Sequence, residues 1–102
     1  MNLIRKAFEK YITLPETDWH FFSSRLIRQE FPKKTLVLKK GQTETHLSFI
    51  ENGVLRFYIP GETEDLTFGF AFSNNFTSAY DSFITQKPSI YNIEALTAAV
   101  LW

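Results

Sequence analysis

A segment rich in hydroxyl side chains, FTSAYDSFITQKPSIYN at residues 76–92, has the chemistry to hold a small ligand. Its Ser and Thr hydroxyls can donate hydrogen bonds to an anion, and Lys87 can add a positive charge. Lys87 and Asp81 are the only charged residues of the segment, and aromatic rings are spaced along it. These residue types are suited to binding, so the segment is the first candidate for a site.

Patterns of catalytic or metal-ligating residues do not occur in the sequence. His20 and His46 are isolated, whereas a catalytic metal ion needs about three converging protein ligands. No G-x-S-x-G turn marks a nucleophilic serine. The carboxylates of Glu62, Glu64 and Asp65 cluster in an expected turn, where solvated charges are more common than an acid and base pair. We therefore expect a protein that is not an enzyme and has no metal or other cofactor.

Composition excludes several further classes of protein. The chain has 102 residues, with 11 basic and 11 acidic side chains, so its zero net charge does not predict direct DNA binding. The absence of Cys excludes disulfides and cysteine-ligated iron–sulfur clusters. The charged N-terminal residues do not resemble a signal peptide, and no apolar run reaches the roughly 18 residues that span a membrane. We expect a cytoplasmic protein without a membrane partner.

Residues 1–27 predict two amphipathic helices. Pro15 ends the first helix, and Asp18 or Thr17 caps a second helix that carries Trp19 and Leu26. The apolar stripe of the first helix consists of Leu3, Ile4, Ala7, Phe8, Tyr11 and Ile12. Such stripes usually pack on a core, so we expect both helices to lie against the rest of the domain.

Residues 28–102 predict six to eight short strands separated by turns. Two apolar runs flank Asn52-Gly53, whose tolerance of positive φ predicts a hairpin. The run LTFGFAF alternates as a strand, with large side chains at every second position. The closing segment SIYNIEALTAAVLW reads as one or two strands, although its Ala-rich part also suits a helix. The pattern is that of a mainly β domain of the sandwich, barrel or roll type.

Three stretches carry a resemblance to a known family. They are KKTLVLKKGQ, the run THLSFIENGVLRFYI with Gly53 at its turn, and NNF before the hydroxyl-rich segment. Together they resemble the cyclic-nucleotide-binding β-roll of the Crp/Fnr superfamily of bacterial transcription regulators. The run DSFITQKPSIYNIEAL is similar to a branch of that superfamily found in Bacteroidetes-type bacteria. The resemblance implies a double-stranded β-helix, or jelly roll, over residues 28–102, flanked by the short N-terminal helices.

The resemblance also implies where a ligand would bind. Members that bind cyclic AMP carry a Gly-Glu pair and, after a short helix, an Arg-Ser or similar pair, which together form a phosphate cassette. The first pair falls on Ser78 and Ala79 and the second on Ser89 and Ile90, so all four positions depart from the pattern. Without the Arg, a charge-assisted interaction typically worth about 1.5 to 3 kcal/mol is lost. The ligand-binding positions implied by this placement are Ser78, Ala79, Tyr80, Lys87, Ser89 and Ile90.

Aromatic side chains are expected in the space that a nucleotide would occupy. They are Phe57, Phe68, Tyr80, Phe83 and Tyr91. Two alternatives remain open for these rings: they line a small apolar pocket with hydroxyl groups at its rim, or they pack on one another and fill the interior.

Three functional hypotheses follow. In the first, the chain is the effector domain of a Crp/Fnr-like regulator that responds to an unidentified small molecule and does not bind cyclic AMP in the usual way. The chain stops inside an apolar run at Trp102, so we expect a dimerisation helix and a DNA-binding domain beyond it. Homodimerisation and DNA contact would then belong to the longer protein. The alternatives are a ligand-free structural or interaction domain and, opposed by the missing His cluster, a cupin-like enzyme.

Overall fold

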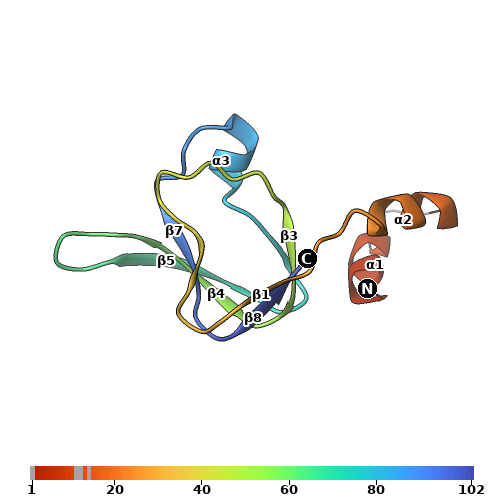
Figure 1. Cartoon of the computed structure of the whole chain (residues 1–102), viewed down its shortest axis with the longest axis horizontal. Helices are drawn as coiled ribbons and strands as arrows, with labels where there is room; N and C mark the ends of the chain where they lie inside the picture. The colour runs from red at the N-terminus through yellow and green to blue at the C-terminus, as the bar shows by residue number, and fades with distance from the viewer. Residues whose placement is uncertain (1, 11–12, 14) are drawn as a thin grey trace.

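The computed structural model describes residues 2–10, 13 and 15–102. Two helices, α1 (Asn2–Glu9) and α2 (Glu16–Ser23), precede the strands and lie together at one side of the molecule (Figure 1). The second helix ends at Ser23, earlier than the sequence pattern predicts, and Leu26 follows it in a turn, where its N–H donates to the backbone oxygen of Ser23 at 3.2 Å. Tyr11 and Ile12, which complete the predicted stripe, lie outside the described residues.

The two helices contact the remainder of the domain through a small apolar cluster. Ile4 of α1, Trp19 of α2 and Phe49 are buried together in it. Leu26 and Trp102 pack against this cluster, so the turn after α2 and residue 102 belong to the same contact. Burial of these large apolar side chains stabilises the packing of the two helices against the domain.

Eight strands in the described part of the chain form two antiparallel sheets of four strands. The first sheet has the order β1 (Gln29–Phe31), β8 (Ala99–Leu101), β3 (Ser48–Asn52) and β6 (Phe76–Thr77). The second has the order β2 (Leu36–Leu38), β7 (Asn92–Ala95), β4 (Val54–Ile59) and β5 (Leu66–Phe72). The predicted mainly β roll is therefore confirmed, and the closing segment forms strands.

The sheets enclose a core to which both contribute. Ile50 and Leu101 come from the first sheet, Leu55 and Ile93 come from the second, and all four are at most 2% exposed. A short helix, α3 (Tyr80–Thr85), lies at one end of the roll (Figure 1). In the part of the chain that the structure describes, no helix is both long enough and apolar enough to cross a membrane.

The chain turns at Asn52-Gly53, but the predicted hairpin there is wrong. Strands β3 and β4 on either side of the turn belong to different sheets and do not pair with each other. Gly53 has φ +113°, and a Cβ added to it would lie only 2.7 Å from the Cβ of Ala99. The glycine therefore allows a corner at which the chain passes from one sheet to the other, close against β8.

The alternating strand β5 is present, with its large side chains facing outward. Leu66, Phe68, Phe70 and Phe72 are between 51% and 63% exposed. The smaller residues between them are half-buried, and Ala71 packs against the core. The hairpin of β4 and β5 projects from the body of the roll, so much of this strand lies away from the core (Figure 1).

Candidate functional site

The hydroxyl-rich segment begins with β6, includes α3 and ends at the first residue of β7. We call residues 78–91 the cassette segment. Ala79 is the residue before the first turn of α3, and Gln86 closes the helix in the left-handed conformation with φ 57°. The short helix that the family resemblance implies is therefore present, at the end of the roll where the resemblance places a ligand.

A carboxylate from another part of the chain occupies the start of this helix. Glu44 lies in the loop between β2 and β3 and is 9% exposed. The N–H of Ala79 donates to its Oε2 at 3.2 Å, and the N–H of His46 donates to its Oε1 at 3.0 Å. An anion bound at the start of a helix accepts hydrogen bonds from backbone N–H groups at this position. One of these groups, the N–H of Ala79, already donates to Glu44.

The backbone of Glu44 is held by the same segment. Its N–H donates to the Oγ of Ser82 at 2.9 Å, and that hydroxyl donates to the backbone oxygen of Lys87 at 2.5 Å. The Nε2 of Gln86 donates to the backbone oxygen of Glu44 at 3.1 Å. The β2–β3 loop and the cassette segment are thus joined by a network in which side chain and backbone both take part.

The other two serines of the cassette segment are also used internally. The hydroxyl of Ser78 donates to the backbone oxygen of His46 at 2.6 Å. The hydroxyl of Ser89 donates to the backbone oxygen of Tyr91 at 2.8 Å and accepts from the N–H of Tyr91 at 3.2 Å. Both serines are buried, and each hydroxyl has a single proton to donate. A ligand could receive a hydrogen bond from either serine only if an internal bond were broken.

The structure divides the six predicted site residues into two groups. A hollow of about 200 Å³ is lined by three of them, Lys87, Ser89 and Ile90. The rest of its lining comes from Asp81, Ser82, Thr85, Pro88 and Tyr91. Ser78, Ala79 and Tyr80 do not line this hollow; Ser78 and Ala79 are buried, and Tyr80 is 48% exposed. At this volume the hollow is smaller than the roughly 300 to 1,000 Å³ usual for drug-sized ligands.

Three of the expected aromatic rings form a cluster beside the cassette segment. The ring centroids of Phe68 and Tyr91 are 5.0 Å apart, and Phe57 lies 6.2 Å from Phe68 and 6.0 Å from Tyr91. Such edge-on and tilted contacts are favourable between aromatic rings. For these three side chains the arrangement supports mutual packing, with Phe57 also against the core.

The electrostatic surroundings of the cassette segment are negative around Tyr91. Burial raises the pKa of the Tyr91 phenol above its ordinary value, and the charges of Asp81 and Glu44 raise it further. Both effects disfavour the phenolate, because burial removes its hydration and the carboxylates repel it. A phosphate brought to the same place would meet the same two carboxylates, with Lys87 as the one cation among the residues that line the hollow.

Glu44 is the principal residue of this site that sequence reasoning missed. It lies 35 positions before Ala79 and carries no motif, since an isolated acid in a polar loop ordinarily points into water. The one feature of the sequence that could have indicated its role is its position in KKGQTETHLSFIENG, a few residues before the apolar strand that follows. The sequence does not reveal which way its side chain turns.

Metal ligands do not gather in the described ranges. Among residues 2–10, 13 and 15–102 there is no group of three or more His, Cys, Asp or Glu side chains that could hold an ion. His20 and His46 are both exposed, and Nδ1 of His46 lies 3.0 Å from the hydroxyl oxygen of Thr45.

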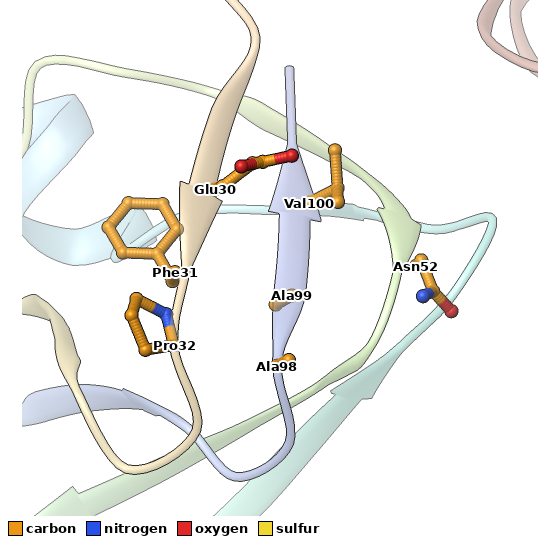
Figure 2. A pocket seen from close by; sticks show the side chains of 7 residues that line it. All are labelled: Glu30, Phe31, Pro32, Asn52, Ala98, Ala99 and Val100. Atoms are coloured by element: carbon orange, nitrogen blue, oxygen red, sulfur yellow. The ribbon is translucent and has the colours of Figure 1, made fainter.

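A broader hollow, of about 450 Å³, lies away from the cassette segment on β1, β8 and β3 (Figure 2). Its lining is Glu30, Phe31, Pro32, Asn52, Ala98, Ala99 and Val100. Its only charged group, Glu30, already pairs with Arg28 at 2.7 Å. Size alone does not make it a site, because few polar groups converge there.

Comparison with solved structures identifies the fold of this chain. No protein-family model matches the sequence, and no curated protein matches it. Among solved structures, cAMP-bound PfPKA-R matches with a TM-score of 0.81 and 15% identity, over 99% of this chain and 37% of that one. The sensor domain of the transcriptional regulator DNR from Pseudomonas aeruginosa matches with a TM-score of 0.81 and 13% identity, over 98% of this chain and 67% of that one.

The chain has the cyclic-nucleotide-binding β-roll fold. The catabolite activator protein of Thermus thermophilus shares it, with a TM-score of 0.69 and 13% identity, over 89% of this chain and 43% of that one. The resemblance to the Crp/Fnr sensor domain is thereby confirmed at the level of the fold, and the Bacteroidetes-type branch stays a prediction. This β-roll spans little more than a third of the PfPKA-R structure, at 37% of its length.

Proposed function

We propose that this β-roll is the sensory domain of a Crp/Fnr-like transcription regulator and that cyclic AMP is not its effector. The fold similarity to the DNR sensor domain and to the catabolite activator protein supports the regulatory role. In this proposal the domain is not an enzyme and works in the cytoplasm. It responds to a different small molecule, and it acts on DNA only through a homodimer of a longer protein.

The observation that carries the second half of the proposal is the Glu44 carboxylate on the N–H of Ala79. A cyclic phosphate would need that donor, and it would have to approach a buried carboxylate of like charge. The sequence offers no Arg within the cassette segment to offset this repulsion. Lys87 is the only cation in the segment, and it can act only as a point charge.

The remaining donors do not favour a phosphate either. The hydroxyls of Ser78, Ser82 and Ser89 already donate to backbone oxygens of the chain. Tyr91, next to Ile90, contributes its ring to the cluster with Phe68. A ligand of this roll would therefore be uncharged or positively charged, and it would contact the hollow beside Asp81 and Tyr91.

Thermal unfolding with candidate ligands tests the proposal. A ligand at a hundred times its dissociation constant stabilises a protein by about 2.7 kcal/mol, which shifts the midpoint of a domain this size by several degrees. We expect no shift with cyclic AMP or cyclic GMP and a shift with at least one uncharged or cationic metabolite from a panel. A cyclic AMP shift would overturn the choice of effector. A gene whose stop codon directly follows codon 102 would overturn the proposed role as the sensory domain of a transcription regulator.

A ligand-free structural or interaction domain is the second candidate. The internal hydrogen bonds of all three cassette serines and the packed rings of Phe57 and Tyr91 favour it. The two candidates differ in one result, because no member of a broad ligand panel should stabilise a purely structural roll.

A further inference from the structure

Two adjoining hollows lie where the N-terminal helices meet the roll. The larger has a volume of about 230 Å³, and its apolar lining consists of Ile4, Leu26, Leu47, Phe49, Phe76 and Trp102. The smaller, of about 100 Å³, shares Leu26, Leu47 and Trp102 with it. The C-terminus lies on the side of the roll that faces the two helices (Figure 1). We call the two hollows together the helix–roll pocket.

The larger hollow has the size and character of a space for one aromatic ring. Phe49 and Phe76 meet in it edge-on, with ring centroids 5.2 Å apart. An apolar cavity of about 150 Å³ is large enough to bind benzene. At about 230 Å³, the larger hollow can therefore hold a single ring together with a short side chain.

Arg25 lines both hollows and brings a positive charge to them. Its Nη1 donates to the backbone oxygen of Phe21 at 3.0 Å, and its Cζ lies 3.6 Å from the centroid of the Phe21 ring. Within the described part of the chain, no hydrogen bond engages its Nε or Nη2, and no carboxylate pairs with it. Arg5, Arg28 and Arg56, in contrast, each pair with a carboxylate. The guanidinium of Arg25 is therefore held in position and still has donors for an anion.

We propose that the helix–roll pocket binds a small aromatic carboxylate, with the ring in the larger hollow and the carboxylate on Arg25. A planar guanidinium can donate two parallel hydrogen bonds to a carboxylate, which fixes the orientation of the ligand. Gln29, His46 and Ser48 line the smaller hollow and add side chains that can form hydrogen bonds. The pocket is separate from the cassette segment, so this inference does not rest on the proposed effector.

Trp102 provides a reporter for the test, because it lines both hollows. Trp19→Phe leaves it as the only tryptophan of the chain. In this variant, titration with benzoate or phenylacetate should change the tryptophan emission. The neutral isostere 2-phenylacetamide should bind about threefold more weakly than phenylacetate or worse, because it has no charge to pair with the exposed Arg25. Calorimetric titration of the wild type measures the same two affinities without the substitution.

Arg25→Gln should remove the preference for the acid over the amide. Arg28→Gln is the matched control, because Arg28 is also exposed, lines neither hollow and pairs with Glu30. We expect this control to keep the preference, and circular dichroism establishes that both variants are folded. Asp81→Asn, in the cassette segment, should leave phenylacetate binding unchanged.

Four results would overturn the proposed carboxylate site. They are a wild type that binds neither acid at millimolar concentration, equal binding of phenylacetate and its amide, a preference that survives Arg25→Gln, and a preference lost equally in Arg28→Gln. If Asp81→Asn weakened phenylacetate binding, the ligand would lie at the cassette segment instead. None of these results depends on the response to cyclic AMP, so this site and the proposed function can fail separately.

Discussion

The carboxylate of Glu44 accepts a hydrogen bond from the N–H of Ala79 at 3.2 Å, across 35 positions of the sequence. The residue before α3 is thereby joined to the loop between β2 and β3, at the end of the roll where a cyclic nucleotide would be expected. The carboxylate of Glu44 thus occupies the N–H group that the phosphate of a ligand could otherwise bind. The stability of the cassette segment should depend on this carboxylate.

Replacing Glu44 should destabilise the domain. Glu44→Ala leaves the N–H groups of Ala79 and His46 without their acceptor, and a buried donor without a partner costs about 1 to 3 kcal/mol. Urea unfolding measures the change. Glu62→Ala, in an exposed turn, is the control and should stay within about 0.5 kcal/mol of the wild type. Equal stability of the two variants would contradict the internal role of Glu44.

The hydroxyl of Ser82 should be as important as the carboxylate. Ser82→Ala leaves the N–H of Glu44 without an acceptor and the backbone oxygen of Lys87 without a donor, at an expected cost of about 1 to 3 kcal/mol. Ser24→Ala removes an exposed hydroxyl that donates to the backbone oxygen of Phe21 and should cost about 0.5 kcal/mol or less. If urea unfolding shows the larger loss for Ser24→Ala, the network does not stabilise the cassette segment.

The Tyr91 phenol should titrate above the ordinary tyrosine pKa of about 10. In the unfolded chain the phenol has its ordinary pKa, so at alkaline pH the unfolded state loses its proton first. Stability from this group is therefore present below about pH 10 and is lost as pH rises through the higher, folded pKa. Ultraviolet difference absorbance of the wild type and Tyr91→Phe isolates the titration of this one tyrosine.

Asp81→Asn separates the charge of Asp81 from the other causes of that shift. Removing this charge should lower the pKa of Tyr91 part of the way toward its ordinary value, because burial and the charge of Glu44 remain. An unchanged titration would mean that Asp81 does not act on Tyr91 in solution.

Two glycines with positive φ should differ in their response to alanine. Gly53 has φ +113°, and an added Cβ would also lie 2.8 Å from the backbone oxygen of Ala98. Gly41 has φ +94°, with nothing within 4 Å of an added Cβ. Gly41→Ala should therefore cost only the backbone strain, about 1 to 2 kcal/mol, whereas Gly53→Ala adds a clash. Thermal unfolding should rank Gly53→Ala as the less stable variant, and the reverse order would contradict the close approach of β8.

Local patterns in the sequence determined a large part of this protein. The strands from β3 to β5 and the turn at Gly53 follow from short-range periodicity and from the backbone freedom of one glycine. The family resemblance implied the position of the cassette segment, and the sequence of that segment shows that it has no Arg. The strands and the turn depend on neighbouring residues, so they could be derived without the fold.

The tertiary structure decided what depends on residues far apart in the chain. Pairing of β3 with β8, and of β4 with β5 and β7, turned an expected hairpin into a corner between sheets. The burial of Glu44 against Ala79 and the exposure of Phe70 also depend on how distant segments meet. Side-chain type sets what a residue can bind, whereas long-range strand pairing sets which groups it reaches. The composition of the cassette could therefore be read from the sequence, and its internal anion could be found only in the folded chain.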